Sequence, residues 1–458
     1  MNENKMRGIK MKKTYAMLMA VLLCLSVVLA GCSDSKKSSG NQADADSEKD
    51  GKKVTITYSS WADPAVEKRR IDAFMKAHPN IEVKMNKAVT WPWDEKLAAA
   101  AAANKLPDVF FVFSVPPSVT NGWLEDLTPY LKKDKDYSKD KVFGNLTETA
   151  EYNGKQYALP QGLYANGIFV NKDLFKKENV ELPKPDWTIN EMREKAVKLT
   201  KVSEKQYGFD GVGGLRETLI PQLDPSQGWL TWDGEKYNFD KPAFVQSNKI
   251  VTDMLTKDKV SAEILPQEER DKEFGKGKSS WNVGKAAMRY GGSSDFGWQS
   301  KELKFDWDFL PMPKDKGQRT PLVTDYIGMA KSSKHKEAAF ELVKWMTYSK
   351  EGWESRIEVE KPITSFPLIN DKSVWEKYLN SKEVPAGMKN VVPMIPDGFV
   401  DGWKWLPGYQ EVMTKIVGNN YEKFVKGEIK PEDISQDLQK RSNQAYEDAK
   451  KKMDEATK

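Results

Sequence analysis

The distribution of apolar residues along the chain predicts strands and helices in alternation from residue 54 onward. Val54–Tyr58 and Ile81–Met85 alternate apolar and polar residues, which is the pattern of a half-buried strand. Val109–Phe113 is a continuous apolar run that indicates a strand buried on both faces. Helical patterns such as Leu97–Ala103 separate these strands. Together they predict an α/β architecture with parallel sheets.

The rest of the chain is organised around the segment Asn153–Phe175. Alternating residues lead up to Pro160, small and polar residues follow, and a short apolar run ends near Asn171. We expect a strand, a bend at Pro160 and Gly162, a second strand and then a helix. The bend would be a hinge where the chain crosses between two lobes. Tyr164 would project from this hinge into a ligand cleft, or it would simply pack against it.

The first residues have the pattern of a bacterial export signal. Basic residues precede the apolar run Met17–Ala30, which is too short for a membrane-spanning helix. Leu29-Ala30-Gly31-Cys32 resembles the lipobox of lipoproteins. The sequence predicts a signal peptide over residues 1–31 and cleavage before Cys32. Diacylglycerol and palmitate-type acyl chains on Cys32 would then hold the protein on the extracytoplasmic face of the cell membrane. An ordinary secretory signal followed by a chance cysteine is the alternative.

The mature chain is expected to hold a tether and two lobes. Residues 32–53 are polar and charged, so they cannot bury enough surface to fold, and we interpret them as a flexible tether. About 400 residues follow, which is more than one core usually carries. We expect residues 54–163 and 312–355 in lobe I, and residues 164–311 and 356–458, with the C-terminal helices, in lobe II.

Charge and cysteine content argue against several classes of protein. The net charge is +5, and the signal peptide carries five cations and Glu3, or +4, which leaves about +1 for the mature chain. This charge gives no support to nucleic-acid binding. Cys24 leaves with the signal and Cys32 is acylated, so no thiol remains for a disulfide, a metal or a nucleophile. His78 and His335 are too far apart in sequence to suggest a metal centre, and no cofactor is expected.

Motifs in a fixed order carry a resemblance over essentially the whole mature chain. They are Trp61 at the first strand end, Leu106–Val109, Leu124–Leu127, Gly154–Pro160, Asn171–Phe175, Trp187-Thr188 with Glu191, and Gly284–Met288. The chain resembles the family 1 extracellular solute-binding proteins, the receptor subunits of carbohydrate ABC importers, to which the maltose-binding proteins belong. The resemblance implies a periplasmic-binding-protein-like fold, in which two hinged α/β lobes close on a ligand in the cleft between them.

Aromatic and polar residues at the strand ends are the candidate ligand contacts, because open α/β sheets bind ligands beyond the carboxyl ends of their strands. A sugar ring offers apolar faces to aromatic side chains and hydroxyls to polar ones. By the resemblance, Tyr164, Ser294 and Trp403 fall at cleft positions of relatives, but Ser294 lacks the ring found there, so a maltodextrin ligand is not implied. The predicted ligand-binding set is Trp61, Asp63, Trp91, Trp93, Ser114, Gln161, Tyr164, Gly292, Ser294, Asp295, Tyr326 and Trp403.

Four members of this set, Asp63 and the three that lie within Gly291–Asp295, have an equally good structural explanation. Asp63 precedes Pro64 and would serve as a helix cap without touching a ligand. The segment Gly291–Asp295 has the composition of a plain turn.

The expected function is capture without catalysis. The chain, expected to be a monomer, would bind a carbohydrate, and an oligosaccharide is the expected ligand. It would deliver this ligand to the transmembrane permease subunits of an ABC importer, whose separate ATPases supply the energy. The alternative is a secreted glycoside hydrolase with paired carboxylates. With 67 acidic residues some pair is always available, and no HExxH, GxSxG or Walker motif occurs. A lysine-rich scaffold lipoprotein is a third class, but it would not need aromatic residues at strand ends.

Overall fold

The computed structural model describes residues 53–458 apart from residues 88, 90, 140 and 362. The signal peptide, Cys32 and the tether up to residue 52 therefore lie outside the described residues. None of the described helices combines the length and the apolar content needed to cross a membrane.

One mixed sheet of nine strands runs through the fold, with strands paired in the order β2-β1-β3-β10-β6-β8-β7 and with β11 beside β10 and β9 beside β6. The pairs of β1 with β2 and with β3 are parallel, as expected, but β10 is antiparallel to both β3 and β6. β7 and β8 are also parallel, as are β10 and β11. The expectation of parallel sheets is therefore wrong for the central pairs β3–β10, β10–β6 and β6–β8. The strands are β1 Val54–Ser59, β2 Ile81–Met85, β3 Val109–Val112, β6 Leu159–Asn171, β7 Tyr207–Asp210, β8 Ala286–Gly292, β9 Trp307–Leu310, β10 Pro321–Met329 and β11 Phe399–Val400; a separate hairpin holds β4 Glu151–Tyr152 and β5 Lys155–Gln156.

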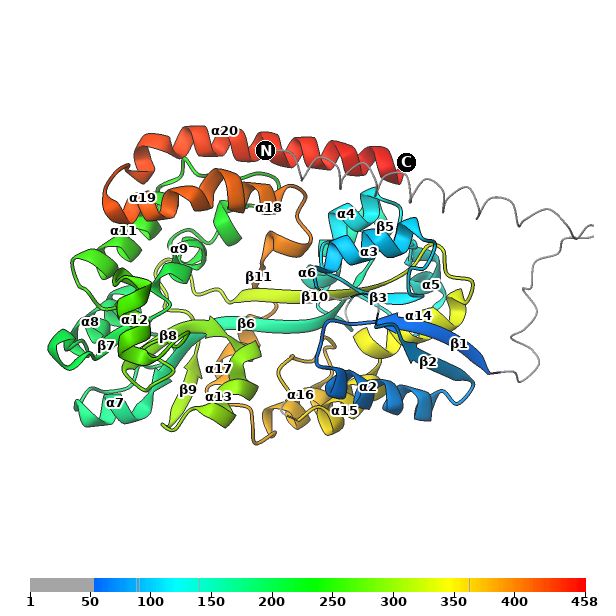
Figure 1. The fold of residues 1–458 in the computed structure, drawn as a ribbon, viewed down its shortest axis with the longest axis horizontal. Coiled ribbons are helices and arrows are strands. Elements are labelled where there is room, and N and C mark those ends of the chain that lie inside the picture. The colour runs from blue at the N-terminus through cyan, green and yellow to red at the C-terminus, as the bar shows by residue number, and fades with distance from the viewer. Residues whose placement is uncertain (1–52, 88, 90, 140, 362) are drawn as a thin grey trace, which may run out of the picture. The chain divides into compact units, whose positions relative to one another are not determined.

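Strand β6 corrects the expected bend at Pro160 and Gly162. It is one strand of 13 residues that passes through both positions. The pairing of β6 with β10 shifts register here, because Asp325 pairs with Gly162 while Tyr326 pairs with Pro160. A proline has no N–H to donate to the ladder, and this bulge accommodates it without ending the strand. Beyond Ala165, β6 pairs with β8 and β9 instead, so a single strand links the two ends of the sheet (Figure 1).

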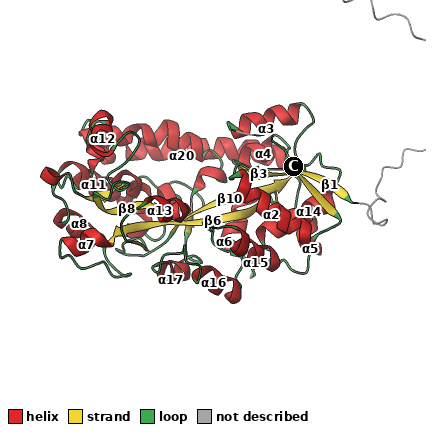
Figure 2. Ribbon diagram, turned by 60° about the horizontal axis from the view of Figure 1, so that its bottom comes forward, coloured by secondary structure: helices red, strands yellow, loops and turns green. Residues whose placement is uncertain are grey.

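The first lobe comprises β1–β3 and the helices beside them. Helix α2 starts as the sequence predicts, since Asp63 caps its first turn and Pro64 occupies its first position. The apolar run of β3 is completely buried. Helices cover both faces of the sheet (Figure 2). The helices of this lobe are α2 Pro64–Ala77, α3 Trp93–Ala102, α4 Val115–Thr120, α5 Thr128–Lys133, α6 Gly144–Thr147, α14 Lys336–Thr347, α15 Lys350–Val359 and α16 Lys372–Leu379.

The expected boundary between residues 355 and 356 falls inside α15, which packs against α2 and α14 of the first lobe. The division of the chain into lobe segments stays a prediction.

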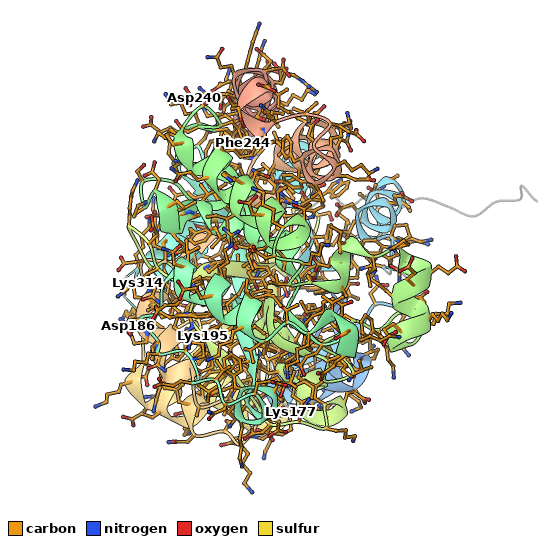
Figure 3. All side chains as sticks on the ribbon, turned by 90° about the vertical axis from the view of Figure 1, so that its left-hand side faces the viewer. Lys177, Asp186, Lys195, Asp240, Phe244 and Lys314 are labelled. Atoms are coloured by element: carbon orange, nitrogen blue, oxygen red, sulfur yellow. The ribbon has the colours of Figure 1, made fainter. Side chains whose placement is uncertain are left out.

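The second lobe comprises β7–β9 and the helices around them, and Figure 3 views it end-on. Helix α8 begins with the predicted capping box, in which Thr188 and Glu191 each bond the other's backbone N–H. Phe244 of α11 is buried, whereas Asp186 and Lys314 form a surface ion pair at 3.5 Å. The helices are α7 Lys172–Lys177, α8 Ile189–Lys198, α9 Leu215–Thr218, α10 Ile220–Leu223, α11 Pro242–Thr256, α12 Gln267–Phe274, α13 Phe296–Glu302, α17 Met388–Val391, α18 Tyr409–Glu411 and α19 Tyr421–Lys426.

The C-terminal helix α20 (Pro431–Thr457) lies along both lobes (Figure 1). In the second lobe its Asn443 accepts a hydrogen bond from the Tyr237 N–H at 2.8 Å. At its other end Thr457 accepts bonds from Asn153 at 2.6 Å and from Lys155 at 2.8 Å. Met453 is buried in the core of the first lobe. The helix therefore ties the lobes together.

Candidate functional site

A cavity of about 790 Å³ opens where the two lobes meet at the crossing strands β6 and β10. The loop from β1 to α2 forms one wall with Trp61 and Asp63, and α13 of the second lobe forms another. Gln161 and Tyr164 of β6 and Asp325 of β10 contribute the floor. The structure thus brings together four of the predicted residues, Trp61, Asp63, Gln161 and Tyr164.

The floor is polar and already organised. The Tyr164 hydroxyl donates to Asp325 Oδ2 at 3.3 Å, and the Lys404 ammonium pairs with the other carboxylate oxygen. Burial, and then the charge of Asp325, hold the pKa of the Tyr164 phenol well above its ordinary value. The phenol therefore remains a hydrogen-bond donor at any physiological pH. The amide of Gln161, which also belongs to β6 and to the floor, donates a hydrogen bond to the backbone carbonyl of Tyr326 at 3.3 Å.

A buried network of charges supports the floor from the side of the first lobe. Arg70 bonds Glu67 at 2.9 Å and pairs with Glu360, which also accepts from Arg356 Nε at 2.9 Å. The side chains of Arg70 and Glu360 are only 11% and 5% exposed. Arg356 donates further to the carbonyl of Gln161 at 2.5 Å, so the network holds β6 against α2 and α15. Burial would raise the pKa of Glu360, but Arg356 and Arg70 outweigh it and hold that pKa below its ordinary value.

Two exposed tryptophans present flat apolar faces in the cavity walls. Trp61 is 57% exposed and stacks on Phe111 with the ring centroids 5.3 Å apart. The Lys404 ammonium lies 5.8 Å from the centre of the Trp61 ring. Trp298 of α13 is 42% exposed and belongs to the wall of the second lobe. A ring-shaped ligand could therefore contact aromatic surface from both lobes at once.

A family model confirms the identity that the motifs suggest. The model described as bacterial extracellular solute-binding protein matches residues 51–352 of the chain. The chain belongs to this family. A binding protein of Brucella abortus is 23% identical to it over 393 residues, which cover 83% of this chain and 89% of that one. The arabinooligosaccharide-binding protein of Bacillus subtilis is 27% identical over 206 residues, 43% of this chain and 44% of the relative.

Solved structures agree on the fold of this solute-binding protein. An ABC substrate-binding protein from Listeria monocytogenes, solved in complex with cycloalternan, superposes with a TM-score of 0.70 at 24% identity over 86% of this chain and 98% of its own. The α/β, two-lobed periplasmic-binding-protein-like fold expected from the sequence is thereby confirmed. Among the described residues no cluster of three or more His, Cys, Asp or Glu side chains could hold a metal ion.

The other predicted tryptophans of the solute-binding protein lie away from the cavity. Trp91 is 75% exposed and meets the edge of Phe113 at 5.8 Å between centroids. Trp93 is buried, and its indole N–H donates to the carbonyl of Phe111 at 2.9 Å. Trp403 is half-buried and packs edge-on against Tyr409, with the centroids 6.5 Å apart.

The remaining predicted residues divide between the core and the end of β8. Ser114 and Tyr326 are buried, and the Tyr326 hydroxyl is bonded to Thr149 at 2.5 Å. Ser294 is exposed, and Asp295 pairs with Arg289 at 2.9 Å. A side chain on Gly292 would place its Cβ 2.8 Å from the Asn166 amide oxygen, so the end of the Asn166 side chain would have to shift.

A second polar cluster, which the sequence did not single out, lies in the second lobe. Glu217 accepts hydrogen bonds from the Trp229 indole at 2.8 Å and from the Tyr421 hydroxyl at 3.3 Å. Burial raises the pKa of Glu217 to about 7. Nearby in the same core, the Asn166 amide donates to the Tyr290 hydroxyl at 3.0 Å.

Several residues of the cavity were also missed. Asp325 carried a weak signal, a lone carboxylate within the apolar run of β10. Trp298 and Lys301 lie in the seven-residue helix α13, which has no motif of its own. Arg70 and Glu360 are 290 residues apart, and nothing local in the sequence links them.

Proposed function

We propose that this solute-binding protein captures a carbohydrate, in the size range of an oligosaccharide, in the cavity between its lobes and delivers it to a membrane permease. The observation that carries the proposal is the cavity itself. Its volume of about 790 Å³ suits a small oligosaccharide, and its walls offer one exposed tryptophan from each lobe. The ligands of two similar proteins, arabinooligosaccharides for one and cycloalternan for the other, support the same class.

The proposal includes closure of the lobes on the ligand. Trp61 and Trp298 belong to different lobes, so a ring that contacts both would favour the closed arrangement over the open one. We place the hinge where β6 passes from β10 to β8, at Tyr164–Asn166. The closed form would dock on the permease subunits of an ABC importer, whose separate ATPases supply the energy.

We further propose that acyl chains on Cys32 hold the protein at the extracytoplasmic face of the membrane. The support is the lipobox sequence that ends at this cysteine. Residues 33–53 would then space the lobes from the lipid surface.

We propose binding without catalysis. A hydrolase needs a carboxyl group with a raised pKa as its general acid, beside a second carboxylate. At this cavity Glu360 has a lowered pKa and is held by Arg70 and Arg356. The carboxylate of Asp325 is likewise engaged, by Lys404 and Tyr164.

A thermal-shift screen of the chain after Cys32 against mono- and oligosaccharides tests the proposal. A ligand that binds only the folded protein at a hundredfold excess over its dissociation constant should stabilise it by about 2.7 kcal/mol. We expect one class of sugar to raise the melting temperature and to be recovered unchanged. Trp61→Ala should weaken this response strongly, whereas Trp91→Ala, at an exposed tryptophan outside the cavity, should not. Recovery of a cleaved sugar would instead establish a hydrolase.

A further inference from the structure

The carboxylates that line the cavity are all engaged within the protein. Glu67 and Glu360 are bonded to arginines of the buried network, and Asp325 is bonded to Lys404 and Tyr164. Asp63 caps α2, with Oδ1 accepting from the N–H groups of residues 65 and 66 at 2.9 and 3.1 Å. Their charges are offset by arginines, by a lysine or by a helix N-terminus before a ligand arrives.

Three cations on the cavity walls have no such partner. Arg69, Lys301 and Lys361 line the cavity and are exposed, and none of them lies within 4.0 Å of a carboxylate among the described residues. Arg69 uses its Nε to donate to the carbonyl of Val359 at 2.8 Å, which fixes the stem of the guanidinium and leaves both Nη groups available. The cavity therefore presents an uncompensated positive charge that comes from both lobes.

We propose that the ligand is an anionic glycan, a sugar with carboxylate or sulfate groups, and that Arg69, Lys301 and Lys361 bind those groups. The inference rests on the proposed function and specifies its substrate class. Closure would draw the three cations together, so that they repel one another and lose hydration; the hydroxyls of a neutral sugar replace part of that hydration but do not offset the repulsion. A carboxylate or sulfate offsets both, through charge-assisted hydrogen bonds.

The placement of the aromatic rings fits the same ligand. Trp298 and Lys301 are three residues apart in α13, so they lie on neighbouring positions of one helix face. On the opposite wall Trp61 lies in the loop before α2, and Arg69 lies within that helix. Each lobe thus pairs an aromatic surface for a sugar ring with a cation for its acidic group.

Isothermal titration of the chain after Cys32 with matched pairs of ligands tests the inference. Each pair consists of an acidic oligosaccharide, such as an oligogalacturonate, an oligoglucuronate or an oligomannuronate, and its methyl ester, which has the same rings without the charge. A sulfated oligosaccharide and its desulfated form make a further pair. We expect the acidic member of one pair to bind at least about tenfold more tightly, with an affinity that falls as salt is raised.

The outcomes separate the inference from the proposed function. If neutral members bind as tightly as acidic ones, or if only neutral sugars bind, the anionic-glycan inference is overturned while the carbohydrate receptor stands. If no sugar of either kind binds, the proposed function fails as well.

Variants test whether the named residues supply the positive charge that binds the acidic groups. Lys301→Gln and Arg69→Gln should each weaken binding of the acidic member by about tenfold and leave its methyl ester unaffected. Lys304→Gln and Lys76→Gln are matched controls, because both lysines are exposed and neither lines the cavity. All four side chains lie at the surface, so the melting temperatures should stay close to that of the unmodified protein. An equal loss for both members of a pair, or an equal loss in the controls, would overturn the assignment.

Discussion

Each lobe buries a carboxylate, and the two are satisfied in different ways. Glu360, beside the first lobe, is bonded to the cations Arg70 and Arg356, whereas Glu217 in the second lobe is bonded to the neutral donors Trp229 and Tyr421. Burial disfavours the charge of both groups. The pKa of Glu360 nevertheless lies below its ordinary value, while that of Glu217 rises to about 7. Neutral hydrogen bonds satisfy the oxygens of a carboxylate but do not offset the loss of its hydration, as a neighbouring cation does.

The difference matters for the two sides of the cleft. Glu360, whose pKa lies below its ordinary value, keeps its negative charge at neutral pH, so the bond from Arg70 to it persists there. The carboxyl group of Glu217, in contrast, gains or loses its proton near pH 7, so the second lobe contains a group whose charge depends on pH.

Removing the shared cation of the first network should have the largest effect on stability. Arg70→Met leaves Glu67 and Glu360 buried without their common partner and should lower the free energy of unfolding by about 3–5 kcal/mol. Chemical denaturation of the variant and of the unmodified protein at pH 7 measures this loss.

The neighbouring Arg69→Met provides the control for that loss. Arg69 is exposed, and no carboxylate of the described residues lies within 4.0 Å of it. The free energy of unfolding of Arg69→Met should therefore differ from that of the unmodified protein by no more than about 0.5 kcal/mol. Equal losses in the two variants would show that the buried network does not stabilise the first lobe.

Glu217 and Glu360 should change the stability of the protein with pH in opposite directions. The folded pKa of Glu217, about 7, lies above its ordinary 4.5, so the folded protein binds the proton more tightly. The contribution of Glu217 to the free energy of unfolding is therefore complete below pH 4.5. It is lost as the pH rises from 4.5 to 7, and the total loss is at most about 3 kcal/mol. Glu360, with a lowered pKa, contributes above its ordinary value of 4.5 and loses that contribution as pH falls below it.

Denaturation of Glu217→Gln and Glu360→Gln across pH 3 to 8 checks both signs. Glu217→Gln should flatten the fall in stability between about pH 4.5 and 7, and Glu360→Gln should flatten the fall in acid. If Glu217→Gln leaves the profile between these pH values unchanged, burial does not raise the pKa of this carboxyl group.

The contrast between the networks also shows what sequence can and cannot predict. The strands β1, β2 and β3, the Asp63 cap and the capping box at Thr188 were predicted, because their signals are local and their spacing is fixed by backbone geometry. The pairing of Arg70 with Glu360 joins residues 290 positions apart, and only the tertiary fold brings them together. No local signal marks such a pair.

The aromatic residues show the same limit. Trp61, Trp91 and Trp93 all follow strand ends, and the sequence could not distinguish between them. In the structure Trp93 is 3% exposed, and Trp91 is 75% exposed outside the cavity. Trp61 alone of the three lines the cavity, where it stacks on Phe111 and is 57% exposed. The neighbours that bury or expose each ring come from distant segments, so spacing alone does not identify the ring that lines the cavity.

The smallest expected effect separates the roles of two tyrosines, one for each lobe. Tyr164→Phe removes the bond to Asp325 and Tyr290→Phe removes the bond from Asn166, so each should cost about 1 kcal/mol of stability. Only Tyr164 lines the cavity, so Tyr164→Phe should also weaken binding of the sugar found by the screen, by about fivefold, while Tyr290→Phe should bind it normally. Isothermal titration of both variants measures the difference. If Tyr290→Phe lost more affinity than Tyr164→Phe, the ligand would lie against the Glu217 cluster of the second lobe rather than on the floor formed by Tyr164 and Asp325.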